Sequence, residues 1–386
     1  MEPTTAPAPT RTTFRRHDLD WLRVLAFALL ILFHTGMFFN HWGWHVKNKV
    51  LSRGIEYPML FLSQWRMALL FMISGAGVYW ALGRRSAGAF AWDRTKRLLL
   101  PLLVGMFVIV PPQIYFERLY RGQFAGSYAD WYPSVFQFVP YQDGGGGGSF
   151  SWHHLWYLAY IFCYSLLGLP LWLALRSDRG KRLTARWGEF FKNPAWLIGL
   201  PVAWHLLIAA LDLPENNHGL AGDWSNHAHD FTLFFCGFVL CTQTAFWEIL
   251  TRWRRLTLGI AAVCSVGILA AYANRVYEPE GTWVLPFALL QITNAWCWLL
   301  TIFGHGYRYL NFKNAFLTYA NPAVYPFYIL HQTITVTVGY FLIPFEWPWG
   351  LKFLLLAGAT FGGCFLMYHC LIRPFGVMRV LFGGKA

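Results

Sequence analysis

The sequence predicts an all-α integral membrane protein, a polytopic bundle of about ten transmembrane helices. Of its 386 residues, 56% are hydrophobic and only 13% are charged. Apolar runs of about 20 residues, the length that crosses a bilayer core, recur along the whole chain. These runs are continuously apolar rather than alternating, which favours helices over a barrel. The predicted spans run from about 21 to 40, 57 to 82, 98 to 116, 152 to 175, 194 to 212, 230 to 248, 256 to 273, 283 to 304, 315 to 340 and 349 to 372.

The basic residues predict how this bundle is oriented. Most Lys and Arg residues outside the spans fall in alternate connecting segments, beginning with the N-terminal one. Because short basic loops stay in the cytoplasm, both termini are predicted to be cytoplasmic. The net charge of +13 then faces lipid phosphates or an anionic cytosolic ligand, and no nucleic acid is needed to explain it. We expect residues 1–14 to form a disordered cytoplasmic tail and residues 15–386 to form a single membrane domain.

The first span carries two ionisable residues, Arg23 and His34, at a depth where such groups are costly and usually functional. A helix turns about 100° and rises about 1.5 Å per residue, so His34 lies within roughly 20° of Arg23 and about 16 Å further along the same face. One helical stripe is therefore predicted to carry a cation near the inner surface and an imidazole deep in the membrane. Asp18 and Asp20 precede this stripe, and we expect them to cap the helix rather than to orient Arg23 or Arg16.

Three further polar residues, Arg66, His154 and His331, come from three other predicted spans. Counting residues from the span ends places them with His34 at a similar depth in the outer half of the membrane. This convergence predicts one cavity. The structural alternatives are a buried ion pair or carbonyl contact for Arg66, a helix–helix hydrogen bond for either of the deeper histidines, and an interfacial position for His154.

The connecting segments add weaker predictions. The longest outer segment, near 117–151, contains the run Gly144–Gly148, which is typical of a flexible tether. Glu117 at its start is a candidate to orient a sugar or a histidine. The inner segment 176–193 is expected to be a basic loop, with an interfacial helix as the alternative. A polar outer loop offers His218, Asp223, His227, His229 and Asp230 as possible zinc ligands, but nothing fixes their geometry, and we predict no metal.

Motifs in this order resemble acyltransferase family 3, a family of integral membrane O-acyltransferases. The opening Arg-x10-His helix of the family resembles the run Asp18, Asp20, Trp21, Leu22 and Arg23, followed by His34. Its next motifs resemble RMALLFMISG from Arg66, the basic group Arg94, Lys96 and Arg97 before Pro101, and HLWYL from His154. Three further stretches are similar to the branch of this family that includes the periplasmic glucan succinyltransferase. They are Trp44, His45 and Val46, the stretch FGHGYRYLNF, and the stretch YPFYILHQTIT around His331.

The resemblance implies transfer of an acyl group, succinyl or acetyl, from cytoplasmic acyl-CoA to a hydroxyl of an extracytoplasmic glycan, in the bacterial inner membrane. His34 occupies the position of the family's essential histidine. Residue chemistry agrees, because the transfer needs a base, for which His34 is suited, and a donor for the developing oxyanion. Arg66 can bind that oxyanion or the distal carboxylate of a succinyl group.

We therefore predict two groups of site residues. The catalytic group comprises His34, Arg66, His331 and His154; the acyl-CoA-binding group at the inner surface comprises Arg23, Arg94, Lys96 and Arg97, which suit the phosphates of CoA. The expected partners are acyl-CoA, the glycan acceptor and membrane lipids. Two rival functions remain open from the residues: a transporter or flippase for a glycan or lipid-linked substrate, and a non-catalytic membrane partner of a glycan assembly system.

Overall fold

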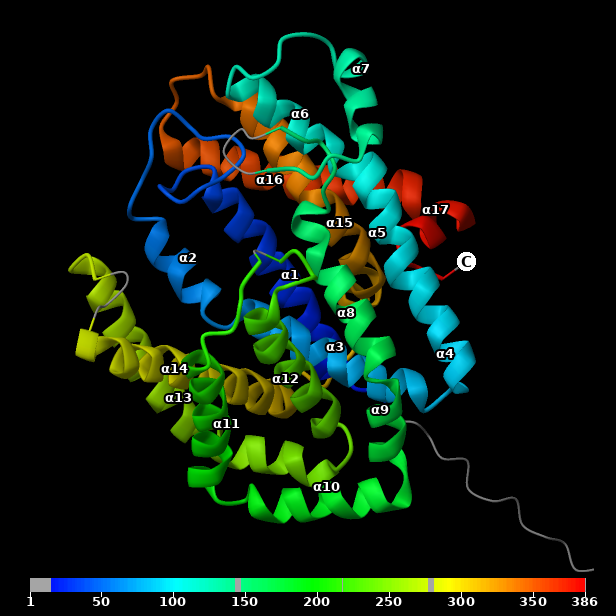
Figure 1. Ribbon diagram of the computed structural model, residues 1–386, viewed down its shortest axis with the longest axis vertical. Helices are drawn as coiled ribbons and strands as arrows, with labels where there is room; N and C mark the ends of the chain where they lie inside the picture. Colours follow the sequence, from blue (N-terminus) through cyan, green and yellow to red (C-terminus); the bar gives the residue numbers. More distant parts are fainter. Residues whose placement is uncertain (1–14, 143–146, 217, 277–280, 386) are drawn as a thin grey trace, which may run out of the picture.

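The computed structural model describes residues 15–142, 147–216, 218–276 and 281–385 (Figure 1). Within these ranges the chain is helical and contains no β-strand, apart from one isolated bridge between Pro140 and Phe150. The all-α prediction is confirmed. The predicted tail 1–14 and most of the glycine tether lie outside the described residues.

The first half of the described chain contains α1 (His17–Met37), α2 (Glu56–Ser63), α3 (Arg66–Leu82), α4 (Ala87–Arg94), α5 (Leu100–Val104), α6 (Pro111–Tyr120), α7 (Tyr128–Trp131), α8 (Trp156–Leu167) and α9 (Leu169–Arg176). The second half contains α10 (Asp178–Phe190), α11 (Pro194–Ala210), α12 (Trp224–Leu240), α13 (Thr244–Ala273), α14 (Val284–Tyr309), α15 (Ala315–Leu342), α16 (Trp349–Met367) and α17 (Gly376–Leu381).

Six helical segments of the described chain are long and apolar enough to cross a membrane, or up to eight if each of two bent pairs is one span. The bent pairs are His153–Leu167 with Leu169–Arg176, at 55°, and Asp178–Phe190 with Pro194–Ala210, at 111°. Two other predicted spans coincide with α12, which has only 17 residues, and with α15, which carries several polar side chains. The count of ten spans and the cytoplasmic termini stay predictions.

One predicted segment differs from what the structure shows, and another has an internal break. Residues 178–190 form the helix α10 rather than a loop, and this helix lies across the lower end of the molecule in Figure 1. The Ser177 side chain caps it by accepting a hydrogen bond from the Gly180 N–H. The second predicted span coincides with one membrane-capable segment, Glu56–Leu82, whose helix is interrupted at Gln64 and Trp65 between α2 and α3. That break places Arg66 at the first turn of a helix.

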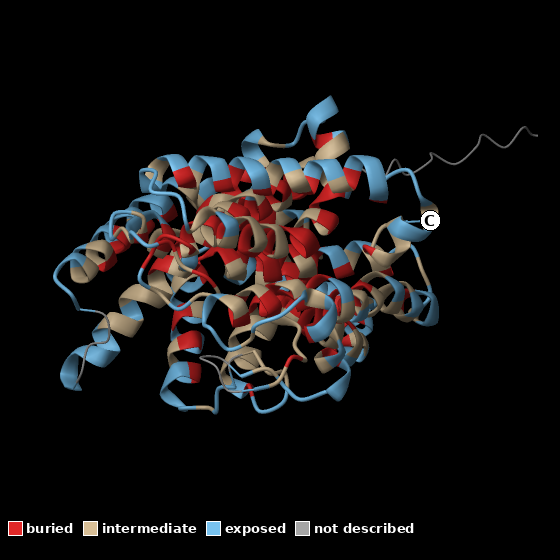
Figure 2. Ribbon diagram, turned by 90° about the horizontal axis from the view of Figure 1, so that it is seen from above, coloured by how far each residue is buried: buried red, intermediate tan, exposed pale blue. Residues whose placement is uncertain are grey.

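The core of the bundle forms around α1, α3, α12 and α15. Figure 2 shows buried residues gathered in the interior and exposed residues around the periphery. α3 and α12 approach so closely that a Cβ on Gly75 would lie 1.8 Å from the Phe234 carbonyl oxygen, and one on Gly237 would lie 1.9 Å from that of Met72. Small residues at such crossings let helix backbones touch in membranes. This contact fixes α3, and with it Arg66, against the rest of the bundle.

Candidate active site

A chain of hydrogen bonds joins His34 on α1 to His331 on α15. His34 Nδ1 lies 2.7 Å from His331 Nε2, and the two rings are nearly parallel, 4.9 Å apart. His331 Nδ1 lies 2.7 Å from the carbonyl oxygen of Tyr328. A carbonyl only accepts, so His331 Nδ1 carries the proton, and the Nε2 of the neutral ring must accept from His34 Nδ1–H. The Nε2 of a neutral His34 is therefore unprotonated.

His34 lines a cavity of about 1030 Å³ together with Arg66 and His154. His331 is fully buried and does not itself line the cavity, but it bonds His34, which does. The remaining walls include segments that connect the helices, among them Trp44, His45, Pro140, Tyr141, Phe150, Ser151, Trp152, Asn216 and His218. The structure thus brings all four predicted catalytic residues together.

Arg66 is a buried cation in this cavity. Only 4% of the residue is exposed, and its guanidinium lies 3.8 Å from the centre of the Phe33 ring, which precedes His34. Its Nε and Nη1 have no hydrogen-bond partner among the described residues, and no ion pair found there includes it. A desolvated guanidinium without a carboxylate strongly favours an incoming anionic group or developing negative charge. The buried ion pair that the sequence left open for Arg66 is not what the structure contains.

His154 ties α8 to α15. Its Nε2 donates to the Ile329 carbonyl at 3.0 Å, and the Tyr328 hydroxyl donates back to the His154 carbonyl. The imidazole edge meets the His331 ring at 5.1 Å. Because Nε2 carries the proton, Nδ1 is an acceptor, and it has no partner within the described ranges. The contacts of His154 thus hold the helix that carries His331.

A second polar network, which the sequence did not predict, lies beside this group. Glu117 is fully buried, accepts hydrogen bonds from His45 Nδ1 at 2.6 Å and the Tyr141 hydroxyl at 2.8 Å, and forms an ion pair with Arg121 Nε at 3.0 Å. Gln332 Nε2 lies 3.1 Å from the other nitrogen of His45. Glu117 therefore orients a histidine, the second of the two roles expected for it. Sequence reasoning missed the partners because they are 72 and 287 residues from His45.

The same network contains the one metal-type cluster of the described residues: ligand atoms of His45, Glu117 and His153 lie within 4.8 Å of one another. Both His45 nitrogens already have hydrogen-bond partners, and Arg121 shares Glu117. This donor set fits a hydrogen-bonded dyad better than a cation site.

The candidate zinc loop does not converge on one point. His227 bonds the Tyr164 hydroxyl and the Leu220 carbonyl, His229 bonds His205, and Asp223 accepts from the Tyr160 hydroxyl.

The N-terminal end of α1, which the sequence predicts to be its inner end, differs from the cavity. Arg23 donates to Asp20 at 2.8 Å and to Asn321 at 2.5 Å, and it is not among the cavity-lining residues. Asp18 pairs with Arg16 at 2.5 Å, and no side-chain cap closes the start of α1. The expectation that these aspartates cap the helix is wrong, because the adjacent guanidiniums offer stronger charge-assisted bonds.

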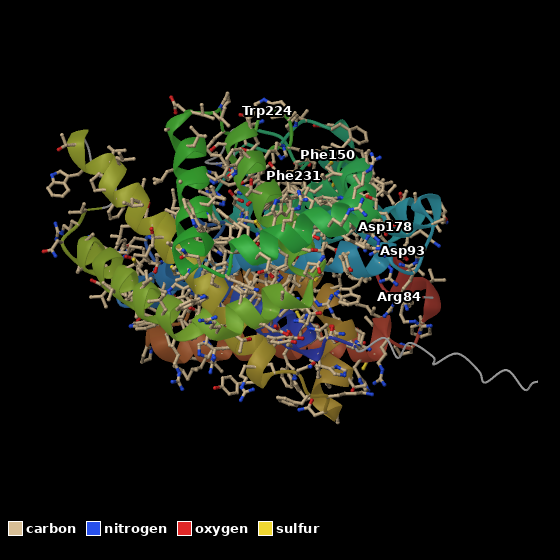
Figure 3. All side chains as sticks on the ribbon, turned by 90° about the horizontal axis from the view of Figure 1, so that it is seen from below. Arg84, Asp93, Phe150, Asp178, Trp224 and Phe231 are labelled. Carbon is tan, nitrogen blue, oxygen red and sulfur yellow. The ribbon has the colours of Figure 1, made fainter. Side chains whose placement is uncertain are left out.

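The other predicted donor-binding residues lie at the start of the helical segment 87–120. Arg97 pairs with Asp93 at 3.1 Å, whereas Arg94 stacks over Phe90 at 4.9 Å and Lys96 over Trp92 at 5.5 Å. Figure 3 shows Asp93 well away from Phe150, which marks the wall of the cavity. None of the four predicted donor-binding residues, Arg23, Arg94, Lys96 and Arg97, lines the cavity.

Comparison with known proteins gives the family. Residues 16–369 match the family model of the acyltransferase 3 family, described as an acyltransferase domain. The chain belongs to this family. It is therefore a membrane acyltransferase, with six to eight helical segments able to cross a bilayer and a requirement for an acyl donor.

Proteins called Glucans biosynthesis protein C are similar to the chain over nearly its whole length. Those of Salmonella paratyphi B (strain ATCC BAA-1250 / SPB7), Salmonella schwarzengrund (strain CVM19633) and Salmonella agona (strain SL483) are each 24% identical to it, with 98% of this chain and 96% of the relative covered. No solved structure matches the chain.

Proposed function

We propose that the protein transfers an acyl group, succinyl or acetyl, from cytoplasmic acyl-CoA to a hydroxyl of an extracytoplasmic glycan. The observation that carries this proposal is the hydrogen-bonded chain of His34, His331 and the Tyr328 carbonyl, which leaves His34 Nε2 unprotonated beside an unpaired Arg66. The names of the glucan-biosynthesis relatives support a glycan acceptor. We further propose a single domain over residues 15–386, with about ten spans and both termini in the cytoplasm of a bacterium.

In direct transfer, the acceptor oxygen attacks the thioester carbonyl carbon while its proton moves to His34 Nε2. The C–S bond then breaks, and the leaving CoA thiolate takes that proton from His34. During the step His34 is an imidazolium, and the lone pair of His331 Nε2 accepts its Nδ1–H, so the charge is shared along the relay. The Tyr328 carbonyl fixes the tautomer of His331 that makes this possible.

The donor must bring its thioester to this cavity while its phosphates stay near the inner surface. Arg94 and Lys96 are suited to those phosphates because neither forms an ion pair within the described ranges. Arg23 and Arg97 each have a carboxylate partner, which an incoming phosphate would share. This arrangement supports entry of acyl-CoA at one end of α1 and reaction at the other.

The test combines purified protein with cells. Protein in detergent should consume acetyl-CoA or succinyl-CoA in the presence of a soluble glucan, and mass spectrometry should find the matching acyl mass on the glucan. Envelope glycans from cells with and without the protein should differ by the same mass. Movement of glycan across vesicles without acyl-CoA consumption would instead support a transporter and overturn the proposal.

A further inference from the structure

Trp44 lies in the segment that follows α1 and lines the cavity beside His34. Its ring centre is 5.2 Å from that of His34 and 5.0 Å from that of His45. The indole Nε1 is buried and has no hydrogen-bond acceptor in the part of the chain that the structure describes. Leaving a buried donor unpaired is energetically costly. An unpaired buried donor next to a candidate base is therefore a candidate functional group.

The segment holds Trp44 in place without using its N–H. The Lys47 ammonium donates to the carbonyls of Met37 and Asn40 at 2.6 and 2.9 Å, and the backbone N–H of Asn48 donates to the Phe38 carbonyl at 2.9 Å. Val46 is fully buried. Such anchoring fixes the indole relative to the outer end of α1. Its N–H is therefore positioned by contacts that do not involve it.

Arg66 also lines this cavity and carries further unpaired donors. Its Nε and Nη1, like Trp44 Nε1, are buried and lack acceptors among the described residues. Both side chains pack against α1 near His34. The Arg66 guanidinium lies 3.8 Å from the centre of the Phe33 ring, and the Trp44 ring packs against the His34 ring itself. Indole and guanidinium nitrogens donate and cannot accept, so neither can take the acceptor proton. Donors of this kind beside a base suit an oxygen that gains negative charge when the base acts.

We propose that the Trp44 indole N–H and the Arg66 guanidinium together form the binding site for the thioester carbonyl oxygen and for the oxyanion it becomes. The inference rests on the proposed function and assigns Trp44 as a further catalytic residue. As the acceptor oxygen bonds to the carbonyl carbon, the C=O electron pair moves to this oxygen. The two donors then hold the charge until the C–S bond breaks and the carbonyl re-forms.

Trp65 provides a matched control. Its Nε1 is also buried without an acceptor in the described residues, and its ring packs against Phe61 and Trp298 at 5.9 and 6.4 Å. Trp65 precedes Arg66 in sequence but is not among the residues that line the cavity. Replacing either tryptophan with phenylalanine removes one unpaired N–H from a buried site. Only at Trp44 should this removal affect the reaction.

The experiment measures initial rates of the full-length protein in detergent, against acyl-CoA and glucan concentration and across pH. Trp44→Phe should lower kcat about 10²-fold, leave KM for both substrates within about twofold and leave the pH midpoint unchanged. Trp65→Phe should stay within about twofold of the wild type. If Trp44 and Arg66 hold one oxygen, Trp44→Phe combined with Arg66→Met should lose less than the product of the two single losses.

A second variant and a spectroscopic readout cover the case in which Trp44→Phe folds poorly. Trp44→His keeps a ring N–H and should retain more activity than Trp44→Phe. With carbonyl-labelled acetyl-CoA bound in the absence of acceptor, the C=O stretch should move to lower frequency in the wild type and less so in either folded Trp44 variant.

Wild-type kcat in Trp44→Phe would overturn the inference, as would a loss confined to KM or a shifted pH midpoint. If His34→Gln is inactive while Trp44→Phe is fully active, only the inference fails. If His34→Gln is itself fully active, the role of His34 as base fails; if the wild type moves glycan without consuming acyl-CoA, the proposed function fails.

Discussion

The two ends of α1 differ in whether their buried polar groups have charged partners. At the inner end, Arg16 and Arg23 each have a carboxylate partner, Asp18 and Asp20, at 2.5 and 2.8 Å. At the outer end, His34 bonds only a neutral histidine, and the neighbouring Arg66 has no acceptor for two of its nitrogens among the described residues. Paired charges limit the cost of burial, whereas unpaired groups keep it. The difference suggests that the inner end is built to hold the fold and the outer end to receive a reacting substrate.

The largest effect is expected at the outer end. His34→Gln removes the base but keeps a polar side chain of similar size, so kcat should fall about 10³-fold or more while the protein still folds. Acyl transfer by purified protein measures this. His305→Gln is the control, because His305 on α14 bonds only the Thr301 carbonyl. Full activity in His34→Gln would mean that the outer end of α1 does not carry the base, and the proposed difference in role between its two ends would fail.

The next effect concerns stability at the inner end. The Asp18 side chain is fully buried and pairs with Arg16, which also lies 3.7 Å from the Trp247 ring. Asp18→Asn leaves that guanidinium without its counter-charge and should destabilise the fold by about 3 kcal/mol. The measurement is Tm in detergent, with kcat of the folded protein unchanged.

The exposed pair of Asp178 and Lys181 supplies the control for that measurement. Their side chains are 86% and 62% exposed, so Asp178→Asn should barely change Tm. Equal Tm losses in Asp18→Asn and Asp178→Asn would contradict a structural role for the inner pair.

The order of residues and the geometry of a helix were enough to predict part of the fold and part of the candidate site. Apolar runs predicted the helices, and depth counting predicted one cavity for four residues, of which His34, Arg66 and His154 line it and His331 bonds His34 from behind. Depth can be counted because a helix has a fixed rise per residue.

Pairings between distant segments could not be predicted in this way. The partners of His45, Glu117 and Gln332, depend on how α6 and α15 pack, and no local pattern specifies that packing. The aspartates at the start of α1 were misassigned because capping and ion pairing use the same residue types at the same positions. Trp44 was noticed as part of a motif, but its unpaired N–H became visible only when its neighbours were known.

A smaller effect should separate substrate binding from chemistry. Arg23 is 37% exposed at its side chain and already bonds Asp20, so a CoA phosphate would add to an existing pair. Arg23→Gln should raise KM for acyl-CoA about 10-fold and leave kcat within about twofold. Arg84→Gln, an exposed residue after α3, should change neither parameter. A fall in kcat without a change in KM would place Arg23 with the outer site instead.

The smallest effect concerns Lys47, which ties the segment carrying Trp44 and His45 to the outer end of α1. Burial lowers the pKa of the Lys47 ammonium from 10.5 to about 8, and the Glu56 carboxylate opposes this shift. The unfolded chain keeps that proton to about pH 10.4 and so binds more protons than the folded protein between about pH 8 and that value. Native stability contributed by this site should therefore rise with pH in this window.

The measurement is the Tm of wild type minus that of Lys47→Met, followed from pH 7 to pH 10. The difference should grow by about 1–2 °C as the pH passes 8, because Lys47→Met removes the titrating group and leaves the others unchanged. Lys49→Met is the control, since Lys49 is 56% exposed and lies 4.0 Å from an exposed Glu346. A difference that is constant with pH would mean that Lys47 is not desolvated. Among the described residues at the outer end of α1, the costly buried groups would then be the unpaired donors beside His34 and would not include the Lys47 ammonium.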